Sequence, residues 1–490
     1  MTTDVKEIIE LVNSPSKKDI ALITKAYNFS EKAHEGQKRM TGDPYFVHAF
    51  STGKNLATFG MDAPTIAAGL LHDTIEDAEV PPETIEKEFG KEVLFMVEGV
   101  TKLGKLKYRG VERHVESLRK LFIATASDIR VLIIKLADRL HNVQTLHGHT
   151  NPEKQKRIAL ETLEIFAPLA NRLGMWKLKS ELEDGAFPYV YPEEHKKVKD
   201  LLKQRSKIDQ KYLEKIHRSL QKELAKQGIQ GNVIQTGHRV KSLYSLYQKL
   251  LKHDMDMDQV YDIIAIRVIV QNVEDCYRVL GIIHGAWTPL PGRVKDYIAT
   301  SKPNGYKSLH TTIFTGNGGI VEVQIRTEEM HKEAEYGIAS HINYKEGESF
   351  LSKKNAVATK KGARLNKKLG WIQRLIEWQK NVSESGEYLK DLKMDFFNDQ
   401  VFVFTPDGDV IDLPEGSTPI DFAYAVHSDI GDHVSGAEMN GKFVSLGTKL
   451  EDGAIVEIQT KKGSHPSPKW LDYAKTTLAL RRIRAALQNK

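Results

Sequence analysis

Apolar residues recur at helical spacing from the N-terminus to about residue 190, and the alternation typical of strands is scarce there. The segments with the clearest helical pattern are 67–73, 131–143 and 158–174. Pro188 and Pro192 mark the end of this block, and a long, highly charged stretch follows at 193–228, closing on Gly228. The pattern therefore predicts an all-α domain followed by one long connecting helix.

Strand-like segments mixed with helical ones begin after residue 200 and continue to about residue 345. The segment 260–270 is rich in β-branched residues and predicts a buried strand. The segment 318–327 alternates strictly, with apolar residues on one face and polar residues, among them Glu322, on the other. This mixture is typical of an α+β domain.

Short strands and strong turn signals fill the last part of the chain. Asp407-Gly408 and Asn440-Gly441 are each flanked by strand-like runs, so each predicts a tight β-hairpin. Between them we expect a short helix, with Thr418 as its cap and Pro419 at its first position. A further strand is predicted at 453–460. Two hairpins around one helix indicate a β-grasp fold of the ubiquitin-like kind.

With 490 residues the chain is too long for a single hydrophobic core, so we expect a multidomain protein. Residues 349–368 have no periodicity and an excess of lysine, which predicts a mobile loop. In chain order the predicted parts are an all-α domain (1–195), an α+β domain (196–345), a basic loop with a connecting helix (346–394), a β-grasp domain (395–462) and a basic C-terminal helix (463–490).

The formal net charge of +6 is distributed unevenly along the chain. Residues 395–460 hold thirteen Asp and Glu against two Lys, whereas residues 461–490 hold eight Lys and Arg against one Asp. An acidic module followed by a basic tail is poorly suited to a uniform phosphate-binding surface. The basic tail could contact RNA, but we favour a solvated helix face, which is the usual role of a charge run.

Two classes of protein are excluded by composition. No run approaches eighteen apolar residues and the first residues lack the pattern of a secretory signal, so we expect neither a membrane span nor export. Cys276 is the single cysteine, which excludes an internal disulfide and a cysteine-rich zinc site. One cysteine fits the reducing environment of the cytoplasm.

A histidine and three acidic residues follow an apolar run at 67–71. On a helix, His72 lies one turn from Glu76, and Asp73 lies one turn from Asp77. Groups that are so costly to desolvate should not follow a core-seeking segment unless something compensates that cost. A bound divalent cation would do so.

Two further metal-ligand candidates, His48 and Asp138, occupy predicted helical positions elsewhere in the chain. Two histidines and two aspartates form a mixed nitrogen and oxygen site suited to manganese, iron or zinc. Such a metal lowers the pKa of bound water and stabilises charge on a phosphoryl oxygen. Glu76 and Asp77 then remain for proton transfer, so the pattern predicts a metal-dependent phosphohydrolase.

A basic helix is predicted at 238–251. Lys241, Ser245 and Lys249 recur at one-turn intervals on it, and Arg239 stands at its start. Such cations can hold the phosphate chain of a nucleotide. By itself this signal is weak, because a basic helix face is usually only solvated.

The stretch 292–314 is more specific, being dense in Lys, Arg, Asn, Tyr and His without helical or strand periodicity, so we predict a functional loop. We expect Tyr306 to stack on a base. The residues expected to meet phosphate or base edges are Lys302, Asn304 and His310. Asp262 and Glu322 are expected to share a magnesium ion for phosphoryl transfer, and Glu322 to accept a proton from the attacking hydroxyl.

The order of His48, His72-Asp73 and Asp138 resembles the HD superfamily of metal-dependent phosphohydrolases. Within it, the stretches 37–50, 70–78, 99–106 and 136–146 are similar to the hydrolase domain of the RelA/SpoT homologues. The stretches similar to the nucleotidyltransferase-like synthetase domain of the same family are 261–268, 302–311, 321–327 and 334–345. The segment 402–431 resembles the TGS domain that follows in long family members.

This resemblance implies a bifunctional enzyme of the stringent response. One domain would transfer diphosphate from ATP to the 3′-hydroxyl of GDP or GTP with Mg²⁺, and the other would remove the 3′-diphosphate of (p)ppGpp with Mn²⁺. The implied metal ligands are His48, His72, Asp73 and Asp138 at the first site and Asp262 and Glu322 at the second. The implied nucleotide contacts are Arg39, Asn142, Arg239, Lys241, Lys249, Arg267, Lys295, Lys302, Asn304, Tyr306, His310 and Gln324.

Three functional readings stay open. The residues 293–296 resemble the signature of members with both activities, which favours the bifunctional enzyme. His238 and Val294 depart from the family pattern, which leaves room for a hydrolase with an inactive synthetase domain. The third reading is a tRNA- or ribosome-associated adaptor with vestigial catalytic domains.

The TGS resemblance implies a partner, either the end of a tRNA or acyl carrier protein. His427 matches the histidine implicated in tRNA contact, although it could equally cap the end of a helix. We expect a cytoplasmic protein that contacts no membrane.

Overall fold

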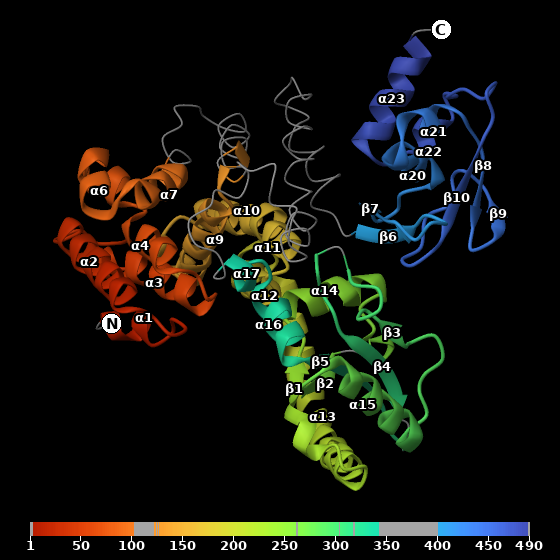
Figure 1. Cartoon of the computed structure of the whole chain (residues 1–490), viewed down its shortest axis with the longest axis horizontal. Helices are drawn as coiled ribbons and strands as arrows, with labels where there is room; N and C mark the ends of the chain where they lie inside the picture. The colour runs from red at the N-terminus through yellow and green to blue at the C-terminus, as the bar shows by residue number, and fades with distance from the viewer. Residues whose placement is uncertain are drawn as a thin grey trace. The chain divides into compact units, whose positions relative to one another are not determined.

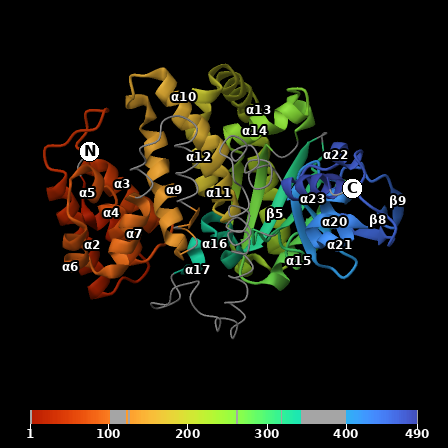
Figure 2. The same cartoon turned by 90° about the horizontal axis from the view of Figure 1, so that it is seen from above.

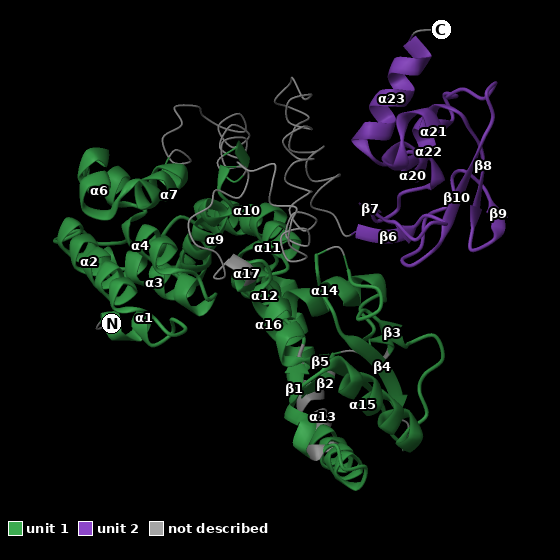
Figure 3. Cartoon of the chain, viewed as in Figure 1, with its two compact units in different colours: residues 1–108, 116–380 green, residues 109–115, 381–490 purple. Residues whose placement is uncertain are grey.

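The computed structural model (Figure 1 and Figure 2) describes residues 3–101, 122–123, 125, 127–260, 263–302, 304–316, 319–342 and 400–488. They fall in two compact units, the first within residues 1–108 and 116–380 and the second within 109–115 and 381–490 (Figure 3). Asp262 and the predicted mobile loop at 349–368 lie outside the described residues. Within the described ranges, no helix combines the length and the apolar character that a bilayer crossing requires.

The regular elements among the described residues of the first part of unit 1 are all helices, as the periodicity predicts. Its helices are α1 (Val5–Ile9), α2 (Lys17–Ala33), α3 (Phe46–Thr58), α4 (Ala63–Leu71), α5 (Thr74–Asp77), α6 (Pro82–Phe89), α7 (Lys91–Thr101), α9 (Ile129–Gln144), α10 (Pro152–Glu161), α11 (Ala167–Arg172) and α12 (Trp176–Val190). Helix α4 is buried along its length and packs closely on α3 and α2. Gly69 permits this approach, because a Cβ there would lie about 2.2 Å from the Leu56 side chain.

The helix predicted at 67–73 is interrupted, so the prediction that His72, Asp73, Glu76 and Asp77 follow one another on a single helix was wrong. Helix α4 ends at Leu71, His72 and Asp73 form a turn, and the short helix α5 begins at Thr74. The Thr74 hydroxyl donates to the Leu71 carbonyl over 2.7 Å, a side-chain bond that competes with the helical pattern. The break directs His72 and Asp73 toward the same point.

One of the two prolines was misread, since Pro188 lies inside α12 instead of ending it. Pro192 does mark the end of the block, because it is the first residue of the next helix, α13 (Pro192–Lys226). A π-helical turn at Thr162–Phe166 joins α10 to α11 just before Pro168, whose missing N–H interrupts the regular bonding. The long charged helix and its end at Gly228, with φ of +66°, are confirmed.

The second part of unit 1 is an α+β domain around a five-stranded sheet of order β1-β2-β5-β4-β3. Its strands are β1 (Val233–Val240), β2 (Ile264–Val270), β3 (Lys295–Asp296), β4 (Leu309–Phe314) and β5 (Ile320–Thr327). Its helices are α14 (Leu243–Lys252), α15 (Val273–Ala286), α16 (Glu328–Tyr336) and α17 (Ala339–Ile342). Strands β2 and β5 are parallel and the other neighbours are antiparallel.

The two faces of this sheet differ in chemistry. Ile266, Val268 and Val323 belong to an apolar core that includes Val279 and Ile283 of α15. The opposite face carries the polar residues of β5. The stretch 292–314, predicted to be one loop, contains β3 and β4, so that prediction was wrong over these strands.

Helix α12 joins the helical part of unit 1 to the sheet part. It packs against α9, α10 and α11 on the one hand and against α13, α14 and α16 on the other (Figure 1 and Figure 2). The two parts therefore share a continuous packed helix within one unit.

Unit 2 has the predicted hairpins and helix. Its elements are β6 (Gln400–Phe404), β7 (Val410–Pro414), α20 (Pro419–Val426), α21 (Ser428–Asp432), β8 (Val434–Met439), β9 (Lys442–Val444), β10 (Val456–Thr460), α22 (Trp470–Tyr473) and α23 (Thr477–Gln488). Asn440 and Gly441 have φ of +53° and +75°, as the tight turn requires. The Phe404 N–H donates to the Ala454 carbonyl beside a parallel Phe404–Ile455 bridge, which links the two sheets in a β-grasp arrangement.

The buried carboxylate of Asp421 fastens the end of unit 2 to its central helix. It accepts bonds from the backbone N–H groups of Thr418, Lys475 and Thr476 and from both threonine hydroxyls. Beyond this point α23 buries Ala479 and Ile483 in the core that contains Ile420. The basic tail is thus an amphipathic helix with an apolar side packed on α20.

We expect Asp421→Ala to destabilise unit 2 by about 3 kcal/mol, because it leaves several buried N–H groups without an acceptor. The measurement is the thermal unfolding of the whole chain, together with hydrogen exchange of the Lys475 and Thr476 amides. Asp407→Ala, at an exposed turn position of the same unit, is the matched control and should change neither. Equal exchange rates in both variants would contradict this role.

Candidate active sites

Four predicted ligand side chains converge between α3, α9 and the α4–α5 turn. His48 Nε2 lies 3.2 Å from Asp138 Oδ1 and 3.4 Å from Asp73 Oδ2. His72 Nε2 lies 3.1 Å from the same Asp73 oxygen and 4.0 Å from the same Asp138 oxygen. Donors bound to one ion at about 2.1 Å are separated by roughly 3 to 3.5 Å. The ligand atoms of His48, His72 and Asp138 all lie within 4.8 Å of one another, so these three residues can hold one metal ion, and Asp73 lies beside both histidines.

Hydrogen bonds outside this cluster turn both imidazoles toward it. The buried His72 ring donates from Nδ1 to the Gly69 carbonyl over 2.8 Å, which leaves Nε2 as the lone-pair atom. That Nε2 is buried and has no hydrogen-bond partner among the residues described. Nitrogen and carboxylate donors, one of them an orphaned buried atom, fit a divalent transition metal. His48, His72 and Asp138 are all buried.

The tautomer of His48 follows from its neighbour His141. Arg39 donates from Nη1 to His141 Nδ1 over 2.9 Å, so this nitrogen is an acceptor. His48 Nδ1 lies 2.9 Å from the same nitrogen and must be the donor. Burial, together with His48 and Arg39, lowers the pKa of His141 to about 3, which keeps it neutral. His48 Nε2 is then left to face the carboxylates.

Both carboxylates of the cluster are held ionised. Burial opposes this, but His72 and His48 keep the pKa of Asp73 well below its usual range. Lys135, 2.8 Å from Asp138 Oδ2, acts with His48 in the same way on the pKa of Asp138. Burial would lower the pKa of His72, but the neighbouring Asp73 carboxylate raises that pKa to about 9. The two ionised carboxylates thus attract positive charge, either a proton on His72 or a dication in its place.

The two further acids lie on α5, next to the cluster. Glu76 is half-buried and Asp77 is at the exposed end of this helix. The Tyr45 hydroxyl lies 2.9 Å from Asp73 Oδ2 and 2.5 Å from Asp77 Oδ2. Burial and these two carboxylates raise the pKa of Tyr45, so its hydroxyl remains protonated.

Arg39 and Asn142, predicted to contact nucleotide, meet at the same place. Arg39 donates from Nη2 to Asn142 Oδ1 over 2.7 Å, and Asn142 donates from Nδ2 to Asp138 Oδ1 over 2.5 Å. The guanidinium thus lies one residue away from a metal-ligand candidate. It provides a cation where a phosphate would approach the cluster.

The predicted residues of the second site form a row across the sheet. Arg267 of β2 pairs with Gln324 of β5, Gln324 with His310 of β4, and His310 with Lys295 of β3. Directly paired residues share a face of a sheet. Glu322 lies two positions before Gln324 and therefore belongs to this polar face as well.

A hydrogen-bonded series connects Glu322 to Tyr306. His310 Nδ1 lies 2.9 Å from Glu322 Oε1, and His310 Nε2 lies 2.8 Å from the Tyr306 hydroxyl. Gln324 donates from Nε2 to Glu322 Oε1 over 3.3 Å, while its buried Oε1 has no hydrogen-bond partner in the described ranges. This acceptor is available to a ligand on the polar face. Asp262, the second predicted Mg²⁺ ligand, is outside the described residues.

Arginines gather at the end of this face nearest α16. Arg267 and the almost fully buried Arg326 both contact Glu335 Oε1, at 3.4 and 3.3 Å. Burial and Arg267 lower the pKa of Arg326 to about 10, and burial and Arg239 lower the pKa of Arg267. The Nε atoms of both Arg267 and Arg326 are buried without a hydrogen-bond partner among the residues described. Crowded cations of this kind favour a bound anion.

The other basic residues flank this face, with one correction. Arg239 lies in β1 and not at the start of a helix, because Ser242 caps α14 and the helix begins at Leu243. Lys241 therefore precedes the helix that carries Lys249. The prediction that Lys241 and Lys249 share one helix face, with Arg239 at the helix start, was therefore wrong, although strand and helix follow each other directly.

The predicted base-contacting loop lies between β3 and β4. Tyr306 is half-buried, with its ring 6.0 Å from those of Tyr297 and Trp176. Asn304 accepts from the Tyr306 N–H over 3.2 Å, and the Lys302 ammonium lies 4.8 Å from the Tyr297 ring centre. These contacts hold Tyr306 beside the polar face.

Comparison with known proteins places these sites in a family. A model of the HD domain matches residues 26–176, one of the region found in RelA/SpoT proteins matches 238–349, and one of the TGS domain matches 401–460. The GTP pyrophosphokinase of Myxococcus xanthus is 46% identical over 476 residues, covering 96% of this chain and 61% of that protein. The chain belongs to the RelA/SpoT family.

Other relatives of this RelA/SpoT protein are named as a hydrolase or as a bifunctional enzyme. The guanosine-3′,5′-bis(diphosphate) 3′-pyrophosphohydrolase of Aquifex aeolicus is 45% identical over 469 residues, covering 96% of this chain and 65% of that protein. The bifunctional (p)ppGpp synthase/hydrolase SpoT of Escherichia coli K12 is 43% identical over 472 residues, covering 96% and 65%. The chain spans less than two thirds of the length of these relatives.

His427, in the TGS domain of this RelA/SpoT protein, connects α20 to α21. Its Nδ1 accepts from the Asp429 N–H over 3.2 Å, and 64% of its side chain is exposed. It therefore caps α21 while presenting most of its ring to solvent. This placement is compatible with both predicted roles of His427, contact with tRNA and capping of a helix end.

Three residues that matter at the first site were missed by sequence reasoning. Tyr45 precedes His48 by three positions, and Lys135 and His141 flank Asp138 at three positions on α9. Residues three positions apart on a helix share a face, and this spacing could have identified Lys135 and His141. Tyr45 lies just before α3 and had no such signal.

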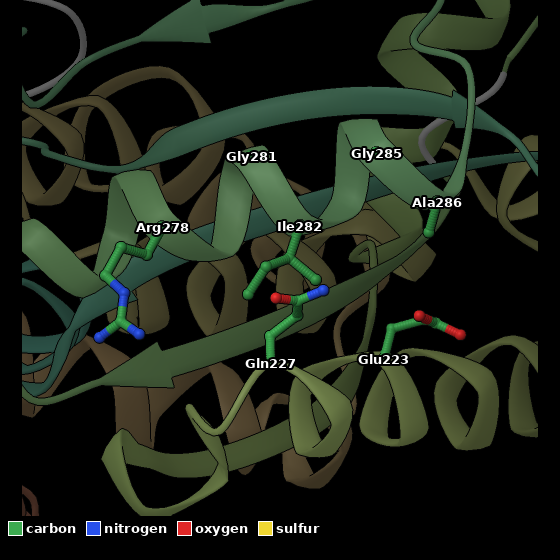
Figure 4. Close-up of a pocket in the computed structure, with 7 residues that line it drawn as sticks. All are labelled: Glu223, Gln227, Arg278, Gly281, Ile282, Gly285 and Ala286. Carbon is green, nitrogen blue, oxygen red and sulfur yellow. The ribbon is translucent and has the colours of Figure 1, made fainter.

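A surface hollow between the end of α13 and α15 contains no predicted site residue (Figure 4). Gly281 and Gly285 open it on the α15 side, opposite Glu223 and Gln227. None of the predicted metal-ligand or nucleotide-binding residues of this family member lines the hollow.

Proposed function

We propose that this protein is a bifunctional alarmone enzyme. It transfers the β,γ-diphosphate of ATP to the 3′-hydroxyl of GDP or GTP and hydrolyses the 3′-diphosphate of (p)ppGpp. The observation that carries the proposal is that unit 1 holds both a possible metal-binding group of His48, His72 and Asp138, with Asp73 beside it, and a separate cationic sheet face around Glu322. We place this activity in the cytoplasm, in keeping with the single cysteine.

For hydrolysis, His48, His72, Asp73 and Asp138 would hold one Mn²⁺. When bound, this ion activates water and neutralises phosphoryl charge. Arg39, fixed by Asn142 and His141, binds the phosphates, and Glu76 or Asp77 moves the proton between the attacking water and the leaving 3′-oxygen.

For synthesis, the residues of the sheet face bind and orient two nucleotides. Arg239, Arg267 and the lysines around α14 would bind the triphosphate of ATP with its Mg²⁺, whose protein ligands are Glu322 and Asp262. Tyr306 would stack on the acceptor guanine, and the unpartnered Gln324 oxygen would accept from its edge. Glu322, beside His310, would accept the proton of the 3′-hydroxyl.

Incubation with ATP, GDP and Mg²⁺, followed by chromatography for a 3′-diphosphorylated product, tests the proposal. Added Mn²⁺ should then return that product to GDP. Loss of (p)ppGpp without any synthesis would instead favour a hydrolase with an inactive second domain. Absence of both reactions, with salt-sensitive tRNA binding, would favour an adaptor. A tRNA or acyl carrier protein partner for the TGS domain is proposed on the family resemblance alone.

The two activities require coupling, since together they would consume ATP without effect. We propose that the segment 165–225, and α12 above all, provides it. Ile338 donates its N–H to the Leu173 carbonyl over 2.9 Å, Trp176 contacts Tyr306, and Asp184 accepts from the Tyr244 N–H over 3.0 Å. Hydrolysis at equal rates with and without a non-reactive ATP analogue plus GDP would contradict coupling.

We expect Gly337→Ala to break this connection. A Cβ at Gly337, where φ is +57°, would lie about 2.1 Å from the Leu173 carbonyl oxygen. The strained backbone costs about 1–3 kcal/mol, so the melting temperature should fall, and hydrolysis should no longer respond to nucleotides at the synthetase site. The measurements are thermal unfolding and hydrolysis with and without the non-reactive pair.

Gly281→Ala is the matched control for Gly337→Ala. A Cβ there meets nothing within 4 Å, since Gly281 borders the hollow of Figure 4. Inside a helix this change should be neutral or stabilising by up to about 1 kcal/mol. An unchanged nucleotide response in Gly337→Ala would contradict the role given to this contact.

A further inference from the structure

The Tyr45 hydroxyl spans the gap between the metal cluster and the second pair of acids. It lies 2.9 Å from Asp73 Oδ2 and 2.5 Å from Asp77 Oδ2. The Asp73 oxygen is the same atom that lies 3.1 and 3.4 Å from the nitrogens of His72 and His48. The hydroxyl has one proton to donate and lies within hydrogen-bond distance of both a metal-ligand oxygen and the Asp77 carboxylate, so both carboxylates are held next to the same atom.

A second group of contacts holds the tyrosine and the backbone of Asp77 together. The Tyr45 ring stacks on the buried His34 ring, with centroids 4.7 Å apart and an interplanar angle of 23°. The Gln37 amide donates from Nε2 to the Asp77 carbonyl over 2.8 Å, so its oxygen accepts from His34 Nδ1, also over 2.8 Å. His34, Gln37, Tyr45 and Asp77 thus form a closed ring of contacts that holds both ends of Asp77.

Asp77 needs such support because its own helix gives little. Helix α5 has four residues and follows the break at His72 and Asp73, and Asp77 is its exposed last residue. A carboxylate there would otherwise sample several rotamers. Misplacement of a reacting group by about 1 Å can cost roughly a hundredfold in rate.

We propose that Tyr45 is a positioning residue for hydrolysis, which with His34 and Gln37 holds the Asp77 carboxylate beside Asp73, where Asp77 transfers the proton of the reaction. The inference rests on the proposed hydrolase function. It assigns to Tyr45 an effect on the chemical step and not on metal affinity or substrate binding.

The test is Tyr45→Phe, which removes only the hydroxyl. We expect kcat for (p)ppGpp hydrolysis to fall about thirtyfold, with KM and the Mn²⁺ affinity measured by electron paramagnetic resonance each within about threefold of the wild type. Because Tyr45 acts through Asp77, Tyr45→Phe combined with Asp77→Asn should be no slower than Asp77→Asn alone. Gln37→Met, which removes the backbone contact, should lower kcat about fivefold.

Tyr27→Phe is the matched control. Tyr27 is a buried tyrosine of the same helical region whose hydroxyl donates to Thr3, and its loss should leave kcat unchanged. A role limited to supporting the metal would instead weaken Mn²⁺ binding by about 10- to 100-fold in Tyr45→Phe and give additive effects with Asp77→Asn. Either of those results, or a wild-type kcat in Tyr45→Phe, overturns the inference but leaves the hydrolase proposal intact. A wild-type protein that binds Mn²⁺ but does not hydrolyse (p)ppGpp overturns the hydrolase proposal and the inference with it.

Discussion

In an Asp73→Ala variant we expect hydrolysis of the (p)ppGpp 3′-diphosphate to fall at least about a thousandfold. Asp73 Oδ2 is the donor that faces both imidazoles, at 3.1 and 3.4 Å. A metal contributes several kcal/mol of charge stabilisation, which corresponds to a factor of about a thousand or more. Synthesis should continue, so the same chain should accumulate product from ATP and GDP. Both rates are measured by chromatography of labelled nucleotides.

The matched control for this prediction is Asp200→Ala, at an exposed position of α13 in the same unit. It removes the same charge and should change neither rate by more than about twofold. If Asp73→Ala hydrolysed at the wild-type rate, the cluster would not be the hydrolytic centre. If it lost both activities, a folding defect would be indicated, and thermal unfolding would reveal it.

The second large effect is expected in Glu322→Gln, where synthesis should fall at least about a thousandfold while hydrolysis stays within about twofold of the wild type. Glu322 is the acceptor for His310 and Gln324, and its side chain is only 12% exposed. Glutamine preserves the shape but removes the charge that would bind Mg²⁺ and accept the 3′-hydroxyl proton. Loss of general-base catalysis alone is typically a factor of about 10² to 10⁴.

Glu329→Gln is the control for Glu322→Gln, since it removes one carboxylate from an exposed position seven residues further along. It should synthesise normally. Normal synthesis by Glu322→Gln would refute the assignment of this sheet face as the diphosphate-transfer site, whatever the outcome for the hydrolase.

Much of the fold could be predicted because local signals decide it. The hairpins at Asp407-Gly408 and Asn440-Gly441 follow from turns that need positive φ, and α9 follows from its apolar periodicity. Strand β4 was missed since it faces the polar site. Its residues His310 and Thr312 pair with Gln324 and Glu322, so the expected apolar alternation is absent there.

The candidate site could be predicted only in part for a similar reason. The metal-ligand candidates were found from residue type and order; His48, His72 and Asp138 form a possible metal-binding group, and Asp73 lies next to His72. The turn at His72 and Asp73 is accompanied by a local bond from the Thr74 hydroxyl to the Leu71 carbonyl, a detail that helical spacing does not reveal. The contacts of Tyr45 likewise depend on Asp73 and Asp77, which are distant in the sequence. Arg326 contacts Glu335, nine residues later in the chain.

The most direct test of the account is the number of Mn²⁺ ions bound per chain in purified wild-type protein and in His72→Ala. The buried His72 Nε2 points at both carboxylates without a hydrogen-bond partner among the described residues. We predict one tightly bound ion per chain in the wild type and none in the variant at the same free concentration. Equal binding by the two proteins, or no binding by either, would contradict the assignment of this cluster as a metal centre.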